Sequence, residues 1–262
     1  MDKIDSVYPV GRSTCLALLA LAATMACSAI PTPAQTATKN TYYARKNTFG
    51  AFVAYSWDSS HILMGVAENR KLLNLGVAYS RRIFLNHALN WQYNGELMPV
   101  ALESDPVQVT VTTYVYTFSN QTETYTQTLS APTVQACHSS SGSGSIGDDT
   151  TYTYVDTCAR RWIAGEAVSP VGFQWNFLPL RKVQPFLDGH GGYMYSTQSV
   201  PIDNAGSFNF TFDFGAGFEL FRTRRHSIRA EYRYHHLSNH YTASQNPGVD
   251  NGLLQVTWCF GR

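Results

Sequence analysis

The stretch SFNFTFDFGAGFELF, at residues 207–221, alternates apolar residues with polar or small ones. Its even-numbered positions are Phe208, Phe210, Phe212, Phe214, Ala216, Phe218 and Leu220. Successive side chains of a β-strand point to opposite faces, so this period predicts a strand with one apolar and one polar face. An α-helix, which repeats every 3.6 residues, would scatter the phenylalanines around its surface.

The same alternation recurs over most of the chain. The segments that show it are 48–57, 72–80, 88–98, 170–178, 183–196, 207–221, 226–239 and 252–260. An even number of antiparallel strands can close into a ring that leaves no unpaired edge. The sequence therefore predicts an all-β protein built on eight strands.

Composition indicates which face of the strands is turned outward. Charged residues make up 14% of the chain, against about 25% in soluble domains. The polar faces carry Gly, Asn, Gln and isolated charges, and the apolar faces end in Tyr and Trp, as do the interface girdles of membrane barrels. We expect an eight-stranded antiparallel transmembrane β-barrel, and a soluble sandwich with the apolar faces as its core stays open as the alternative.

The connections between these segments alternate in length. Short ones lie at 81–87, 179–182 and 222–225, and long ones at 58–71, about 99–169, 197–206 and 240–251. Membrane barrels have short periplasmic turns and longer extracellular loops. The pattern favours a barrel whose N-terminus is periplasmic and which carries a long extracellular insertion at about 99–169.

The insertion contains a predicted hairpin and a flexible loop. Its Thr, Val and Tyr residues alternate around an SNQT turn, and a Ser/Gly-rich run follows without a Gly-x-Ser-x-Gly nucleophile motif. Cys137 and Cys158 bracket that run and predict a disulfide in an oxidising compartment. Cys259 is left as a packed structural thiol.

The N-terminus reads as a targeting segment. Lys3 and Arg12 precede the apolar run 15–29, and small residues and prolines follow it, which is the order of a secretory signal peptide. We assign residues 1–34 to the signal peptide and 35–262 to the barrel. A lipoprotein anchored at Cys27 stays open.

The stretch 234–252 carries the candidate chemistry. Continuing the alternation of 226–239 sends His235 into the barrel, and His236 and Ser238 out together on the lipid face. A metal site built from His235, His236 and His240 is disfavoured for that reason, although a calcium site near Asp250 stays open. The inward charges are predicted to form a lumen ion-pair network, namely Glu96, Asp188, Asp213, Glu219, Arg229, Glu231 and Arg233.

The residues 236–239 and 246–250 resemble the PagL-type lipid A 3-O-deacylases. The resemblance implies a barrel with an outward triad in which His236 is the general base, Ser238 the nucleophile and Asp250 the acid. The family's acid is Glu, whereas this chain has Asp. Asn239, Asn246 and Gly248 fall where the family supports the oxyanion and the substrate.

The expected function is hydrolysis of an ester-linked 3-hydroxyacyl chain of lipid A, with no cofactor and no metal. The expected partner is lipopolysaccharide in the outer leaflet of a Gram-negative outer membrane, which the active site faces; a homodimer is left open. The net charge of +1 gives no reason to expect a nucleic-acid partner. The alternative function is a noncatalytic outer-membrane barrel with an adhesive or structural role.

Overall fold

The computed structural model describes residues 42–59, 61–119 and 121–262, so the predicted signal peptide and Cys27 lie outside the described residues. Within these ranges the regular structure is entirely β. Its strands are β1 (Asn47–Ser56), β2 (Lys71–Leu85), β3 (Leu89–Phe118), β4 (Gln121–Pro132), β5 (Ser140–Ile146), β6 (Thr150–Phe177), β7 (Val183–Ser196), β8 (Phe208–Phe221), β9 (His226–Ser238) and β10 (Val249–Gly261). The described part of the chain holds no helix that could cross a membrane.

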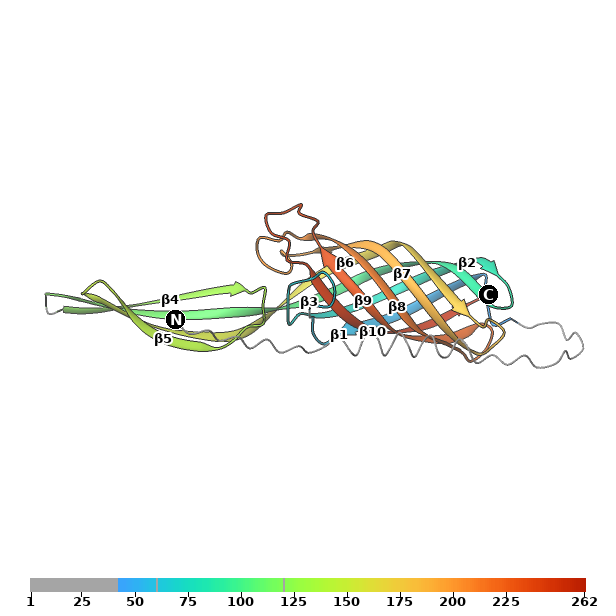
Figure 1. Cartoon of the computed structure of the whole chain (residues 1–262), viewed down its shortest axis with the longest axis horizontal. Coiled ribbons are helices and arrows are strands. Elements are labelled where there is room, and N and C mark those ends of the chain that lie inside the picture. The colour runs from blue at the N-terminus through green and yellow to red at the C-terminus, as the bar shows by residue number, and fades with distance from the viewer. Residues whose placement is uncertain (1–41, 60, 120) are drawn as a thin grey trace, which may run out of the picture. The chain divides into compact units, whose positions relative to one another are not determined.

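Eight of the strands close into an antiparallel barrel (Figure 1). Going round the ring, β1 pairs with β2, β2 with β3, β3 with β6, and then each strand with the next until β10 returns to β1. The predicted eight-stranded fold is confirmed. The closing pair β3–β6 joins segments that the insertion separates in sequence.

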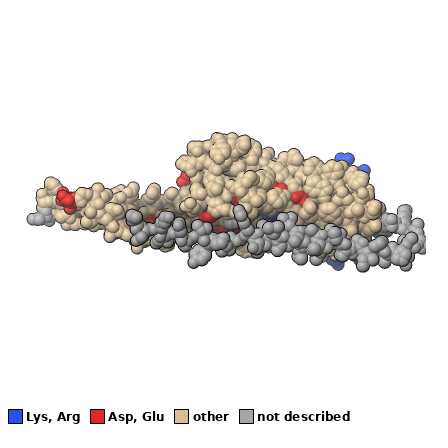
Figure 2. All heavy atoms as spheres, viewed as in Figure 1, with Lys and Arg blue, Asp and Glu red and all other residues tan. Residues whose placement is uncertain are grey.

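The barrel has an apolar outside. On the face seen in Figure 2, most of the surface carries neither Lys or Arg nor Asp or Glu. The outward side chains include Phe49, Val53, Leu75, Val77, Val171, Leu187, Phe210, Phe214, Phe218, Ile228, Val256, Trp258 and Phe260, all of them exposed. Hydrocarbon outside and polar groups inside is the arrangement of a membrane-spanning barrel.

Charged side chains fill the inside of the barrel around Arg233. Its guanidinium lies 2.8 Å from Glu96, 3.1 Å from Glu231, 3.3 Å from Asp188 and 3.4 Å from Asp213. A second pair joins Arg229 to Glu219 at 3.3 Å, and Glu219 also binds Arg45. The predicted lumen network is confirmed. Buried charges need such partners, because an unpaired one would remain desolvated without compensation.

The connections follow the predicted alternation. At one end of the barrel they are short, at 86–88, 178–182 and 222–225, and at the other end they include 57–70, 197–207 and 239–248. β10 begins at Val249, three residues before the predicted segment 252–260. Asp250 is therefore a strand residue, and it is not carried by the last loop as the sequence suggested.

The predicted insertion continues the barrel strands. β3 and β6 stay paired as far as Tyr116 and Thr150, β4 adds to the outer edge of β3, and β5 adds to that of β6 (Figure 1). We call the four-stranded sheet over residues 107–157 the extension. The predicted hairpin is confirmed as β3–β4, whereas the prediction of a flexible Ser/Gly loop is wrong, because backbone pairing with β6 holds that run as β5.

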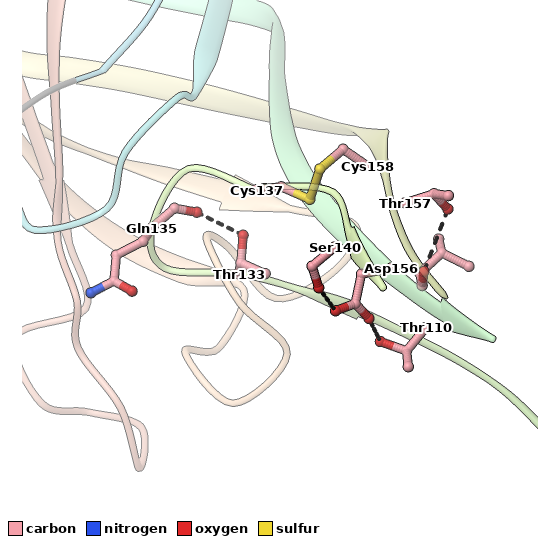
Figure 3. The surroundings of a disulfide bond; sticks show 9 residues. Thr110, Thr133, Gln135, Cys137, Ser140, Asp156, Thr157 and Cys158 are labelled. Carbon is pink, nitrogen blue, oxygen red and sulfur yellow. Dashed lines mark hydrogen bonds between the residues drawn. A yellow bond between two sulfur atoms is a disulfide. The ribbon is translucent and has the colours of Figure 1, made fainter. Parts of the chain in front are cut away.

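A disulfide and a buried carboxylate brace the base of the extension (Figure 3). Cys137 is bonded to Cys158, as predicted, and Cys259 is free and buried. Asp156 accepts hydrogen bonds of 2.6 Å from the hydroxyls of both Ser140 and Thr110, and so links β5, β6 and β3. These two donors, Ser140 first, lower the pKa of Asp156.

Candidate active site

Strand register brings His236 and Asp250 together. In the β9–β10 ladder the two residues are direct cross-strand partners, so their side chains leave the sheet on the same face. His236 is also opposite Phe212 on β8, and the two ring centroids are 5.1 Å apart. The imidazole therefore lies on the outer face of the barrel, between an aromatic ring and a carboxylate.

His235 lies on the other face. Its Nδ1 is 3.7 Å from Asp213 in the lumen, and the side chain is buried there. The predicted division between an inward His235 and an outward His236 is confirmed. Among the described residues, no grouping of His, Cys, Asp and Glu could hold a metal ion.

The carboxylate of Asp250 is fully buried and accepts hydrogen bonds from four donors. Its Oδ1 accepts from His236 Nδ1 at 2.7 Å and from the Tyr234 hydroxyl at 2.8 Å. Its Oδ2 accepts from the backbone N–H groups of Leu63 and Met64, at 2.7 and 2.9 Å. These bonds fix the carboxylate, which in turn fixes the proton of the imidazole on Nδ1 and leaves Nε2 as the acceptor.

The loop 57–70 forms the cover over Asp250. Ala67 makes a parallel bridge to Val249, and the N–H of Ala67 donates to the carbonyl of Gly248 at 3.0 Å. A Cβ at Gly65 would lie 2.5 Å from the backbone nitrogen of Asp250. Only glycine permits this approach, so Gly65 lets the loop close on the carboxylate and exclude water from it.

Gly248 forms a second close approach, on the side of the imidazole. Its φ is +60°, and a Cβ there would lie 3.2 Å from Cε1 of His236. The left-handed backbone favours glycine, and a Cβ at this distance would force the imidazole to shift. Gly248 thus shapes the space around His236, and no side chain of its own contributes to the site.

Ser238 and His236 line one open groove on the outer face. The groove has a volume of about 440 Å³ and is lined by Met64, Phe210, Thr211, Phe212, His236, Ser238 and His240. Ser238 is the last residue of β9 and is half-buried, two positions from His236 on the same face. Its hydroxyl has no hydrogen-bond partner within the described part of the chain.

The two asparagines organise the last loop. The side-chain amide of Asn239 donates to the carbonyls of Ala205 and Gln245, at 2.5 and 2.6 Å, and is buried. The backbone N–H of Asn239 donates to Asn246 Oδ1 at 3.0 Å. The side-chain amide of Asn239 is thus committed to holding the loop. The Nδ2 group of Asn246 has no such commitment among the described residues.

Three parts of the site were missed by reasoning from the sequence. Tyr234 was not singled out, although it lies two positions before His236 on the same face, which is the signal that could have found it. The N–H groups of Leu63 and Met64 carry no sequence signal, because any residue supplies one. Gly65 could be recognised only once the loop was known to contact Asp250.

The chain is similar to known proteins in family and in fold. The model of the family described as "Lipid A 3-O-deacylase (PagL)" matches residues 87–258. No curated protein sequence matches the chain. The crystal structure of the outer membrane enzyme PagL is similar at 10% identity and a TM-score of 0.45, covering 81% of this chain and 99% of that one. Neisserial surface protein A (NspA) is similar at 12% identity and a TM-score of 0.42, covering 83% and 97%.

Proposed function

This chain belongs to the lipid A 3-O-deacylase (PagL) family, and on that premise we propose that it is an outer-membrane esterase of a Gram-negative bacterium. It acts on lipid A in the outer leaflet, where it hydrolyses the ester of a 3-hydroxyacyl chain. Ser238 is the nucleophile, His236 the general base and Asp250 the acid that orients it. The observation that carries the proposal is the 2.7 Å contact of His236 Nδ1 with a carboxylate held by three further donors.

Acylation begins with proton transfer from Ser238 Oγ to His236 Nε2. The oxygen then adds to the ester carbonyl, and Asp250 stabilises the imidazolium without taking its proton. When the tetrahedral intermediate collapses, the bond from carbon to the sugar oxygen breaks, and His236 gives its proton to that oxygen. The deacylated lipid A leaves with a free hydroxyl, and the acyl chain stays on Ser238.

Deacylation repeats the sequence with water. His236 takes a proton from the water, the hydroxide adds to the acyl carbonyl, and the Ser238 oxygen leaves and recovers the proton. The fatty acid is released and the enzyme is restored. No metal or cofactor takes part in either half of this scheme.

The oxyanion needs donors beside Ser238, and the last loop supplies two candidates. The Asn246 side-chain amide is one, and the backbone N–H of His240, two residues after Ser238, is the other. His240 and Tyr241 both have positive φ, of 51° and 59°. The N–H of Tyr241 donates to Asn239 Oδ1 at 2.8 Å, so the N–H of His240 is the backbone donor of this turn that we assign to the oxyanion. One oxyanion donor typically lowers the barrier by about 3 kcal/mol.

The groove suits an acyl substrate that is already in a bilayer. Phe210 and Met64 are 45% and 54% exposed beside the buried imidazole, so hydrocarbon can enter from the lipid side without crossing water. The Ser and His pair lies at the end of β9 that the long loops share. A site at that depth meets the ester linkages near the sugar, and it does not meet the chain ends in the bilayer centre.

Replacing Ser238 separates this proposal from a noncatalytic barrel with an adhesive or structural role. We expect Ser238→Ala to release 3-hydroxy fatty acid from defined lipopolysaccharide at least about 10⁴-fold more slowly than the parent. Ser244→Ala is the matched control, since this exposed serine of the same loop donates only to the carbonyl of Asn204. Equal, measurable rates for the parent and Ser238→Ala would refute Ser238 as the nucleophile, and no release by the parent would favour the noncatalytic barrel.

A further inference from the structure

Tyrosines gather on one face of the extension, outside the site described above. The register places Tyr125 of β4, Tyr114 of β3 and Tyr152 of β6 in one row across three strands. The ring centroids of Tyr114 lie 6.3 Å from Tyr125 and 6.2 Å from Tyr152, with interplanar angles of 26° and 45°. Tyr116 continues the group, 6.3 Å from Tyr114 at 24°. We call these residues, together with Tyr154, the tyrosine face.

Glycines of β5 give two of the rings their position. A Cβ at Gly144 would lie 2.6 Å from the hydroxyl of Tyr152, and one at Gly142 would lie 2.7 Å from Cε1 of Tyr154. Each ring therefore lies across a neighbouring glycine on β5. The Ser-Gly alternation of β5 has a physical reason in this contact, because any larger residue would lift the rings off the sheet.

The tyrosine face stays open to solvent. Tyr125 is 56% exposed and Tyr116 is 43% exposed, and the other three rings are half-buried. The opposite face of the same strands carries small β-branched residues, with Thr126, Thr113 and Thr153 in one row. An exposed aromatic patch on one face alone marks an interaction surface.

The charge of the extension indicates the chemistry of its partner. From 107 to 157 the sequence contains no Lys and no Arg, whereas it contains Glu123, Asp148, Asp149 and Asp156. Phosphate-bearing partners and anionic membrane surfaces are bound by basic groups, so both are disfavoured. Flat rings beside hydroxyl, amide and carboxylate groups suit a neutral saccharide, whose C–H groups pack on aromatic faces while its hydroxyls donate to the acceptors.

The extension is joined to the cover of the candidate active site. The carbonyl of Val134 lies in the segment between β4 and β5. It accepts one hydrogen bond of 2.8 Å from the N–H of Glu68 and another of 2.8 Å from the side chain of Arg70. In return, Glu68 accepts from the N–H of Ala136 at 3.2 Å. Glu68 and Arg70 belong to the loop 57–70, which also binds Asp250. The base of the extension is therefore hydrogen-bonded to the loop that covers Asp250.

We propose that the tyrosine face binds the saccharide chain of the lipopolysaccharide molecule whose lipid A is bound beside Ser238. The inference rests on the proposed function, and it adds a second contact on the same substrate. The membrane-facing groove takes an acyl chain, and the extension takes neutral sugars of the same molecule. Binding the sugars raises the local concentration of the ester at the catalytic residues, as in any two-site attachment.

The test compares two substrates and three variants of the full chain in lipid vesicles. The substrates are long-chain lipopolysaccharide and free lipid A, which lacks the saccharide chain attached to lipid A in lipopolysaccharide. The variants replace Tyr114, Tyr125 and Tyr152 together with Ala or with Phe, or replace the row Thr113, Thr126 and Thr153 with Ala. We expect the Tyr→Ala triple variant to lose about tenfold in kcat/KM on long-chain lipopolysaccharide and to match the parent on free lipid A. The Tyr→Phe triple variant keeps the rings and the Thr→Ala triple variant keeps the tyrosine face, so both should match the parent on both substrates.

A direct binding measurement separates failure of this inference from failure of the proposed function. The probe is polysaccharide released from lipopolysaccharide by mild acid, titrated against the parent and the Tyr→Ala variant. Binding to the parent that the variant loses supports the inference even where no substrate is hydrolysed. The inference is overturned by either of two results: no binding of polysaccharide to the parent, whether or not the parent forms a dimer that the Tyr→Ala variant dissolves, or equal kcat/KM of the parent and the Tyr→Ala variant on long-chain lipopolysaccharide.

Discussion

Asp250→Asn distinguishes a catalytic carboxylate from a structural one, because it keeps the shape of the side chain and removes one acceptor. In the parent, one carboxylate oxygen faces His236 and Tyr234, and the other faces the N–H groups of Leu63 and Met64. The side chain of an asparagine has one oxygen and one NH2 group. Its NH2 group therefore faces either His236 and Tyr234 or the N–H groups of Leu63 and Met64. Turning that group to the loop would leave two N–H groups without an acceptor, at a cost of about 1–3 kcal/mol each.

The orientation of lower free energy keeps the loop closed and changes the tautomer of His236. The asparagine NH2 group then donates to His236 Nδ1, so the ring proton moves to Nε2, which can no longer accept the proton of Ser238. We expect kcat to fall about 10⁴-fold, which corresponds to about 5.4 kcal/mol in the barrier. The unfolding midpoint should change little by comparison.

Two assays check this expectation. Release of 3-hydroxy fatty acid from lipopolysaccharide gives kcat, and hydrogen exchange at Leu63 and Met64 reports whether the loop stays closed. A variant that keeps the exchange protection of the parent and loses activity fits the reasoning. A variant within about tenfold of the parent's kcat would refute it, because Asp250 would then have no part in setting the tautomer of His236.

Three further predictions concern the hydrogen bond of Tyr234, the backbone at Gly248 and the carboxylate of Asp156. Tyr234→Phe removes one hydrogen bond to a charged group, of the kind that contributes about 1.5–3 kcal/mol, and should lower kcat by about tenfold with KM unchanged; a KM effect alone would contradict this role. Gly248→Ala should lower activity about 100-fold by displacing the imidazole, whereas Gly147→Ala, which also has positive φ but has nothing within 4 Å of the new Cβ, should leave activity unchanged. The lowered pKa of Asp156 gives the extension stability that is full above the ordinary value of about 3.9 and is lost as the pH falls through the lowered one. The protection against hydrogen exchange over 107–157, relative to the intrinsic exchange rate at each pH, should therefore fall at acidic pH, and Asp156→Asn should remove that pH dependence.

Alternation of residues was enough to predict the faces of the barrel. It sent Arg233 and His235 inward and His236 and Ser238 outward, because a strand residue has only two directions available and the apolar neighbours determine which is which. The same local pattern predicted the long hairpin, since Val, Thr and Tyr keep their period through Phe118. These features depend on nearest neighbours in the sequence.

Features that depend on contacts between distant segments could not be predicted. The start of β10 at Val249 depends on pairing with Leu237, so Asp250 was expected in a loop and lies in a strand. The two N–H donors from the loop 57–70 are 187 and 186 residues away from Asp250 in the sequence, and backbone donors are not reflected in the residue types. β5 was missed because its Ser and Gly residues have no apolar period, and their pairing with β6 and the rings above them supply the reason for the strand.

Covalent labelling of Ser238 tests the central claim most directly. A long-chain alkyl fluorophosphonate reacts with a serine only where a neighbouring base activates it, so peptide mass spectrometry of the labelled protein in vesicles identifies the nucleophile. We predict one label on the peptide that contains Ser238, absent from Ser238→Ala and strongly reduced in Asp250→Asn. An unlabelled parent, or a label on any other serine, would contradict the proposed site.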